Sequence, residues 1–118
     1  MRDEGCIDYV EIPVTDLDRT RAFFEQLYGW EFQEWGPDYY SFNDGRLDGG
    51  FRRADEPAPA GSVLLVFFSQ DLERDYDRVK ELGATISQEI FDFPGGRRFH
   101  FVEPAGTEFA IWASAKEE

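Results

Sequence analysis

One histidine and two glutamates are the residues of this chain best suited to acid–base or metal chemistry. His100 is the only histidine in the sequence, and strand alternation predicts that Glu11 and Glu108 share its side of a sheet. An imidazole beside a carboxylate is a general acid–base pair near neutral pH, and one histidine with two carboxylates is also a known set of metal ligands. Tyr9 is a further candidate acid. The candidate catalytic residues are therefore His100, Glu11, Glu108 and Tyr9, although all four also suit ordinary polar positions on solvated strands.

Other chemistries find little support in the sequence. Neither a serine-centred nor a cysteine-centred nucleophile arrangement is visible, and no phosphate loop of the GxxxxGK type occurs. Cys6 is the only cysteine, so an internal disulfide is excluded, which fits a reducing cytoplasm. The net charge of −13 argues against nucleic acid and anionic membranes as partners. No apolar run is long enough to cross a bilayer, and the acidic first residues predict no signal peptide.

The candidate residues must be positioned by a structural unit that the chain contains twice. Residues 10–30, VEIPVTDLDRTRAFFEQLYGW, predict a strand followed by an amphipathic helix, and residues 64–84, LLVFFSQDLERDYDRVKELGA, repeat this plan. Asp71 of the second copy stands fifty-five positions after its counterpart Asp16. Each copy is followed by residues that predict further strands and a hairpin. Thr15 is the expected N-cap of the first helix, and Gly29 and Gly83 are expected to end the two helices.

The length and the repeat together predict the architecture. With 118 residues, 42% of them apolar, the chain is long enough for one domain with a sizeable core. We predict a single α+β domain over residues 1–118, in which two tandem βαβββ units form a curved mixed sheet with helices on its outer face and a concave pocket. Unit one covers about residues 5–52, a linker about 53–61, and unit two about 62–113. The second unit should begin with a strand over Val63–Phe68, and Phe93–Gly96 should form a mobile loop.

The apolar pattern of the final hairpin indicates which side chains face the pocket. If Glu103 pairs with Thr107, apolar side chains such as Phe101 lie under the helices and their alternates lie on the other face. Aromatic rings on that face could grip a planar or apolar ligand, with Trp35 a further candidate, and Arg98 could hold a carboxylate or phosphate. The predicted ligand-binding residues are Tyr9, Glu11, Tyr40, Leu64, Val66, Phe68, Arg98, His100, Glu108, Ala110 and Trp112.

Two βαβββ units of this length, with EIPVTDLDRTRAFFEQLYGW near the start and FHFVEPAGTEFAIW near the end, resemble the vicinal oxygen chelate superfamily. That superfamily includes glyoxalase I, bleomycin-resistance proteins and extradiol dioxygenases. The resemblance covers essentially the whole chain and rests on the first helix motif, the Gly49-Gly50 hairpin end and the EPAG turn. It implies the fold, whereas a fold does not determine an activity. It also implies a homodimer, because relatives are usually dimers and the sheet edges would otherwise stay exposed.

The resemblance further implies positions for a metal. Enzymes of the superfamily place one ligand near the start of each unit's first strand and one on each unit's last strand. In this chain these positions fall on Tyr9, on Leu64, on Gly49 or Gly50, and on Ala110. Leu, Gly and Ala side chains carry no donor atom, and Tyr is an uncommon ligand for Zn²⁺ or Mg²⁺. We therefore expect neither a metal at the usual site nor another cofactor, while a divalent metal displaced to the histidine and glutamates named above stays an alternative.

The pattern leaves three hypotheses of function. The first is a glyoxalase/bleomycin-resistance-like protein that binds a small molecule between the sheet and the mobile loop, without the family's usual metal site. The second is a metal-dependent lyase, isomerase or dioxygenase of the same fold that uses the displaced site. The third is an interaction module whose concave face is filled by its own aromatic side chains. We expect the first, in a cytoplasmic homodimer.

Overall fold

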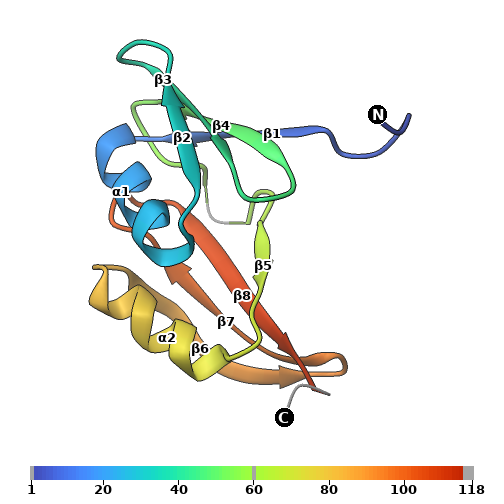
Figure 1. The fold of residues 1–118 in the computed structure, drawn as a ribbon. Coiled ribbons are helices and arrows are strands. Elements are labelled where there is room, and N and C mark those ends of the chain that lie inside the picture. Colours follow the sequence, from blue (N-terminus) through green and yellow to red (C-terminus); the bar gives the residue numbers. More distant parts are fainter. Residues whose placement is uncertain (1, 60, 116–118) are drawn as a thin grey trace. The chain divides into compact units, whose positions relative to one another are not determined.

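Two units of the same construction follow one another along the chain (Figure 1). In the computed structural model, which describes residues 2–59 and 61–115, the chain divides into unit one, Met1–Ala58, and unit two, Pro59–Glu118. Each unit has one helix and one four-stranded mixed sheet. This confirms the predicted α+β class with tandem βαβββ units, and it assigns the eight strands to two sheets, one in each unit.

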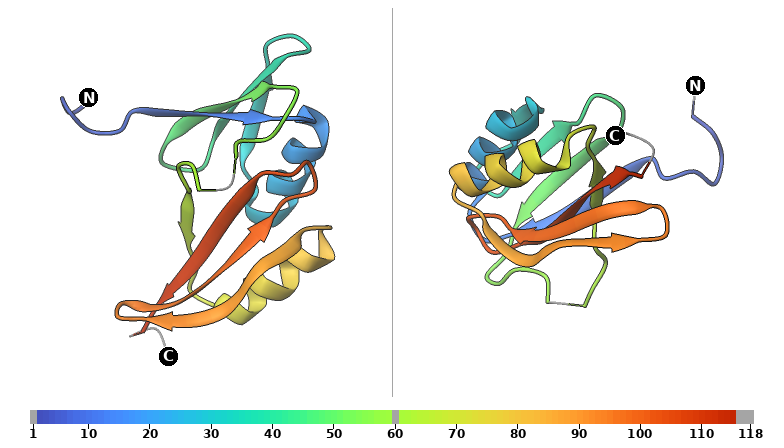
Figure 2. Two further views of the ribbon diagram at one scale, coloured as in Figure 1. Left: turned by 180° about the vertical axis from the view of Figure 1, so that it is seen from behind. Right: turned by 90° about the horizontal axis from the view of Figure 1, so that it is seen from below.

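Unit one consists of β1 (Tyr9–Val14), α1 (Leu17–Tyr28), β2 (Glu31–Glu34), β3 (Tyr39–Asn43) and β4 (Asp48–Arg53). Its sheet has the order β1-β4-β3-β2, in which β1 and β4 are parallel and the other neighbours are antiparallel. The helix lies on one face of this sheet (Figure 2), and an aromatic stack holds it there. Phe24 of the helix and Phe51 of β4 are fully buried, the rings of Phe24 and Trp30 are 4.3 Å apart, and those of Trp30 and Phe42 are 4.7 Å apart.

Unit two consists of β5 (Val66–Phe68), α2 (Leu72–Glu81), β6 (Thr85–Phe93), β7 (Gly96–Val102) and β8 (Glu108–Ser114), with the sheet order β5-β8-β7-β6. The predicted register of the last hairpin is confirmed, because Phe101 pairs with Phe109 and Phe99 with Ile111. All four are buried, and the Phe99 ring packs edge-on against Tyr76 of α2 at 5.2 Å. One face of the sheet is therefore the core, and the other face has no helix.

Both helices begin at an aspartate, so the prediction of Thr15 as N-cap was wrong. Asp16 caps α1 by accepting a hydrogen bond from the backbone N–H of Arg19, and Asp71 caps α2 in the same way through Arg74, each at 3.1 Å. A short carboxylate satisfies an unpaired N–H of the first turn and also suits the positive end of the helix dipole. The caps therefore occupy equivalent places in the two copies of the repeat.

Two further local predictions about unit two were wrong. The first strand begins at Val66, not at Val63, because only Val66–Phe68 pair with β8. The predicted mobile loop is instead a tight hairpin, since Phe93 ends β6, Gly96 begins β7, and these two residues pair with each other. Only Pro94 and Gly95 lie between the strands, and the Gly95 carbonyl accepts a hydrogen bond from the N–H of Ala115.

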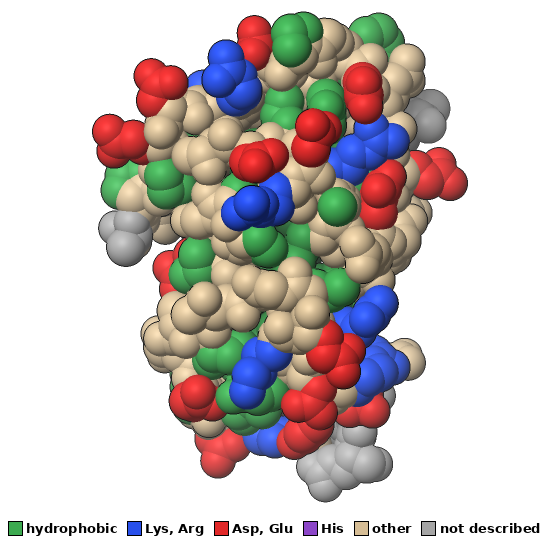
Figure 3. Space-filling view, turned by 90° about the vertical axis from the view of Figure 1, so that its left-hand side faces the viewer, with side chains coloured by type: hydrophobic (Ala, Val, Ile, Leu, Met, Phe, Trp, Pro, Cys, Tyr) green, Lys and Arg blue, Asp and Glu red, His purple; other side chains and the backbone are tan. Residues whose placement is uncertain are grey.

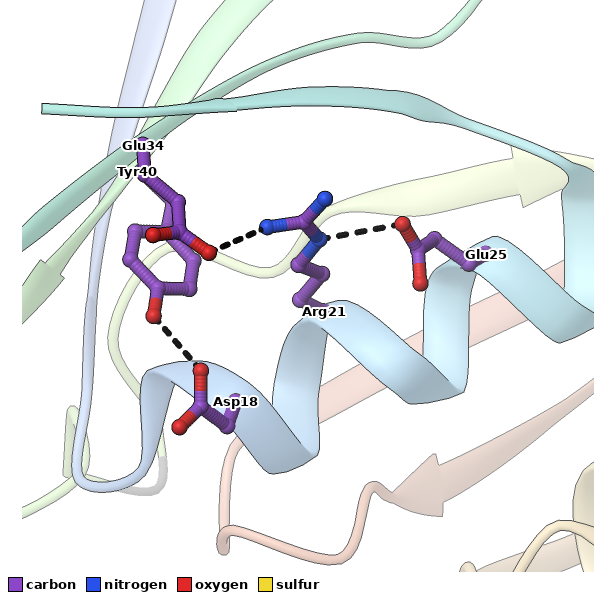
Figure 4. A network of polar contacts seen from close by, with 5 residues as sticks. All are labelled: Asp18, Arg21, Glu25, Glu34 and Tyr40. Atoms are coloured by element: carbon purple, nitrogen blue, oxygen red, sulfur yellow. Dashed lines mark hydrogen bonds and ion pairs between the residues drawn. The ribbon is translucent and has the colours of Figure 1, made fainter.

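Tyr40 does not face the predicted pocket. It pairs with Phe51 across the strands, so both side chains point toward α1, and Tyr40 is 7% exposed. Its hydroxyl donates a 2.5 Å hydrogen bond to Asp18 in the first turn of α1 (Figure 4). The sequence offers two adjacent tyrosines, and the alternation of the strand gives the helix-free face to Tyr39 instead.

A basic side chain extends this contact between helix and sheet. The Arg21 guanidinium lies 5.6 Å from the centre of the Tyr40 ring. It also binds Glu25 one turn along the helix at 3.0 Å and Glu34 on β2 at 2.8 Å (Figure 4). The network therefore joins α1 to β2 and β3 at the edge of the aromatic core.

Replacing Tyr40 with Phe should lower the free energy of unfolding by about 1 kcal/mol. This is less than the usual 1.5–3 kcal/mol for a hydrogen bond to an ionised group, because Asp18 is exposed and can bind water once the hydroxyl is gone. The bond to Asp18, with burial second, raises the pKa of Tyr40 from 10.0 to about 12. The stabilisation should thus be complete below pH 10 and disappear as the pH rises to about 12. Urea unfolding of both proteins between pH 8 and 12 measures this. A stability difference that stays constant over that range would contradict the assignment.

Candidate functional site

The helix-free face of unit two gathers most of the predicted ligand-binding residues. Directly paired residues share a face of a sheet. Arg98 pairs with Trp112, His100 with Ala110 and Val102 with Glu108, and two residues of β5 pair with β8 on the same side. The predicted residues brought together on this face are Val66, Phe68, Arg98, His100, Glu108, Ala110 and Trp112. Leu64, also predicted, precedes β5 and belongs to none of the paired strands.

A chain of polar contacts crosses this face. The Arg98 guanidinium directs Nε and Nη2 to Nε2 of His100, at 3.2 and 3.0 Å. On the other side of the ring, Nδ1 of His100 lies 3.4 Å from Oε2 of Glu108. The same Glu108 oxygen accepts a 3.0 Å hydrogen bond from the hydroxyl of Ser87 on β6. His100 is only 6% exposed. Arg98 on one side of the imidazole ring and Glu108 on the other fix its orientation.

These contacts select one tautomer of His100. A guanidinium has donors only, so Nε2 accepts and Nδ1 carries the proton that points toward Glu108. In this arrangement the free lone pair of the imidazole is already used by Arg98. For His100 to act as a general base or a metal ligand, Arg98 would have to release it.

Aromatic rings surround the Arg98 guanidinium. Its central carbon lies 5.6 Å from the centre of the Phe91 ring and 5.9 Å from that of Phe93, within the range of cation–π contacts. The row continues through Trp112, whose ring is 6.1 Å from Phe93 and 5.3 Å from Phe68. Phe68 is 49% exposed. The face therefore combines an aromatic floor with a charged donor.

Sequence reasoning missed the two phenylalanines of β6. The pairing between β6 and β7 shifts twice, between Ile86 and Gln88 and between Gln88 and Phe91, so simple alternation could not assign their faces. A signal was present in Pro94-Gly95. A two-residue turn at this position places Phe91 directly opposite Arg98, as observed.

The other two predicted residues, Tyr9 and Glu11, lie on the helix-free face of unit one. The hydroxyls of Tyr9 and Tyr39 are 2.5 Å apart, and Tyr39 donates to Glu11 at 3.2 Å. Arg52 also donates to Glu11, at 3.3 Å. Tyr39 and Arg52 were not predicted as part of a site. For Tyr39 the reason is that the choice of Tyr40 for this face excluded its neighbour.

The residues at the family's metal positions do not fit a metal. The Tyr9 hydroxyl is already bonded to Tyr39, and both phenols lie directly above Gly50, where a Cβ would be 2.0 Å from the Tyr39 oxygen. Ala110 is buried beside His100 and has no donor atom in its side chain. Within residues 2–59 and 61–115, no three His, Cys, Asp or Glu side chains are grouped so that they could hold a metal ion. The alternative ligand set combines Glu11 of unit one with two residues of unit two, and it stays a hypothesis.

Charged side chains of both signs are mixed on the part of the surface that can be seen in Figure 3. On the side shown in Figure 3, acidic side chains are interspersed with Lys and Arg, and the basic side chains do not gather into one patch. No helix in the described part of the chain is long and apolar enough to cross a membrane.

Comparisons with known proteins agree with this architecture. The family model of the Glyoxalase/Bleomycin resistance protein/Dioxygenase superfamily matches residues 6–111. No curated protein sequence gives a significant match.

Three solved structures illustrate the similarity. A glyoxalase/bleomycin resistance protein/dioxygenase family enzyme from Burkholderia phytofirmans PsJN is 18% identical with a TM-score of 0.78, over 92% of this chain and 99% of that one. TioX from Micromonospora sp. ML1 is 21% identical with a TM-score of 0.69, over 93% and 99%. The fosfomycin resistance protein FosX from Listeria monocytogenes, complexed with Mn(II) and sulfate, is 19% identical with a TM-score of 0.81, over 98% and 94%. At these identities the likeness extends to the fold alone.

The assigned tautomer of His100 is directly testable. Long-range ¹⁵N–¹H NMR spectra of the full chain near neutral pH should show His100 protonated at Nδ1 and not at Nε2, because Arg98 can only donate. Exchanging Arg98 for Met should weaken this preference, since Nε2 then loses its donor and only Glu108 still favours a proton on Nδ1. The same exchange at Arg97, whose guanidinium binds Glu73 of α2, is the matched control and should leave the spectrum unchanged. Protonation at Nε2 in the unaltered protein would contradict the assignment.

Proposed function

The chain belongs to the glyoxalase/bleomycin resistance protein/dioxygenase superfamily, and we propose that it binds a small organic anion on the helix-free face of unit two. The ligand would have a planar or apolar body and a carboxylate or phosphate group. One observation carries this proposal. Arg98 sits among Phe91, Phe93 and Trp112 on a sheet face with no helix, and is oriented by a buried histidine.

The chemistry of Arg98 supports an anionic ligand. A guanidinium has five N–H donors, and the contacts to His100 use those on Nε and Nη2. Donors therefore remain for a ligand, and two of them could bind a carboxylate or phosphate side by side. Because His100 is itself held by Glu108, the guanidinium is fixed before the ligand arrives, which lowers the entropic cost of binding.

We propose that binding at this site does not depend on a metal. The residues at the family's ligand positions lack suitable donor atoms or are bonded to other side chains, and the lone pair of His100 is shared with Arg98. The alternative is a metal-dependent lyase, isomerase or dioxygenase. FosX, which was solved with Mn(II), is the relative that favours it. In this chain that alternative requires His100 to leave Arg98 and join Glu11 and Glu108 around the ion.

The binding proposal predicts that arylcarboxylates or arylphosphates bind in a ligand-observed NMR screen of the full chain. The Arg98→Met variant should bind the best hit at least about tenfold more weakly, because a hydrogen bond to a charged group contributes about 1.5–3 kcal/mol. Arg97→Met, on the other face of the same strand, should leave the affinity unchanged. Equal affinities for both variants, or no bound anion in the screen, would overturn the proposal.

Metal content separates the two functions. Elemental mass spectrometry of the protein, after chelation and reloading with Zn²⁺, Ni²⁺, Fe²⁺ or Mn²⁺, should detect no stoichiometric metal. About one metal per chain that is lost in His100→Ala would contradict the metal-independent mechanism and direct attention to lyase and dioxygenase assays.

The proposal also includes a cytoplasmic homodimer. The exposed β5 side chains Val66 and Phe68, 40% and 49% exposed, and the lone Cys6 support these two parts of it. Light scattering of the purified protein should give twice the mass of the 13.7 kDa chain, and a monomer at micromolar concentration would contradict the dimer.

A further inference from the structure

Four polar side chains form a connected cluster on the helix-free face of unit one. This tyrosine cluster consists of Tyr9 and Glu11 on β1, Tyr39 on β3 and Arg52 on β4. Its two phenols meet above Gly50, where a Cβ would lie 2.0 Å from the Tyr39 oxygen and 2.6 Å from the Tyr9 oxygen. Gly50 is therefore what allows the two hydroxyls to approach to 2.5 Å.

The hydrogen bonds of the cluster run in one direction. Glu11 accepts from Arg52 and from the hydroxyl of Tyr39. Because the Tyr39 proton is committed to Glu11, the Tyr39 oxygen must accept the proton of Tyr9. Burial, with the Tyr9 bond second, raises the pKa of Tyr39 well above its ordinary value, so Tyr39 keeps its proton at neutral pH. The hydrogen bonds end at the Tyr9 oxygen, which can accept a bond from a ligand but has no further proton to donate.

The Tyr9 side chain lines a groove of about 540 Å³ on the same unit. Trp35, which is 61% exposed, lies in the same groove and donates its indole N–H to the hydroxyl of Ser41 at 2.9 Å. With this N–H occupied, the indole presents its ring to a ligand. The groove therefore contains an exposed, oriented indole ring and a tyrosine oxygen that can accept a hydrogen bond, which are two elements of a recognition site.

The charges of the groove select the sign of the ligand. Glu31 and Asp48 are exposed acidic residues of its lining, while its basic residue, Arg2, forms an ion pair with Asp8 at 2.6 Å. A cationic ligand would be attracted by these carboxylates and could place its charge near the aromatic rings. An anion would be repelled by these carboxylates and would find no free proton on the Tyr9 hydroxyl.

We propose that this groove is a second small-molecule site, specific for an organic cation. An ammonium or similar N–H group of the ligand would donate to the Tyr9 oxygen, and its aromatic or apolar body would lie against Trp35. The site uses unit one alone and does not rest on the anion site proposed for unit two.

Three probes of nearly equal shape test the proposal on the ¹⁵N-labelled full chain at low ionic strength. 2-Phenylethylammonium should shift the Trp35 indole signal and the amides of β1 and β3, and should bind at least about tenfold more tightly than neutral 2-phenylethanol. Phenylacetate should leave the Trp35 signal unmoved. Equal binding of the ammonium ion and the alcohol, or ammonium shifts confined to other residues, would overturn the proposal.

Matched variants assign the interaction to the cluster. Tyr9→Phe removes the accepting oxygen and should weaken ammonium binding by about tenfold. Asp48→Asn removes one carboxylate and should also weaken it, which keeps the test valid if the first variant folds poorly. Tyr40→Phe, on the helix side of the same sheet, should leave the affinity unchanged. Unaltered affinity in both Tyr9→Phe and Asp48→Asn would overturn the assignment.

Discussion

The packing of a helix on one face of a sheet, made once in each unit, is the constraint on which the rest of the structure depends. In unit two the burial of Phe99 and Phe101 beneath α2 leaves their neighbours no choice of side. Arg98 and His100 must then lie together on the opposite face, and β8 contributes Glu108 because it pairs with the same strand. The polar chain is thus a consequence of where the phenylalanines are buried, and a slip of one residue in this hairpin would place the histidine in the core.

How much of the structure could be predicted follows from the same constraint. The final hairpin was predicted correctly because the EPAG turn allows one natural pairing, which alternation then carries along both strands. Alternation could not assign faces to the adjacent Tyr39 and Tyr40, because two neighbouring residues of the same type fit either assignment. It failed also along β6, where two register shifts interrupt the pattern. The fold could therefore be predicted from periodicity, whereas part of each site depended on a strand register that had to be correct to within one residue.

The hydrogen-bond partners within the sites lie beyond any pattern of this kind. The sequence made Tyr9 a candidate acid, but in the structure its proton is donated to Tyr39, so the Tyr9 oxygen is left as a hydrogen-bond acceptor. His100 was the candidate base and ligand, but Arg98, two residues away on the same strand, uses its lone pair. In both cases the partner determines the chemistry. Such a pairing depends on side-chain conformations and on close approach, including the missing Cβ of Gly50, which residue types alone do not specify.

The two units share their architecture, but their chains of hydrogen bonds differ: the chain in unit one ends in a free acceptor, and the chain in unit two ends in free donors. In unit one the chain runs from Tyr9 through Tyr39 to a carboxylate anchored by Arg52, so its free end accepts a hydrogen bond. In unit two an arginine is anchored by its own acceptor, so its free end donates. A metal would have provided a fixed positive centre for the oxygen atoms of a ligand. A guanidinium held by a histidine supplies charge and direction but no vacant coordination position, which suits the anion binding that we propose for this face.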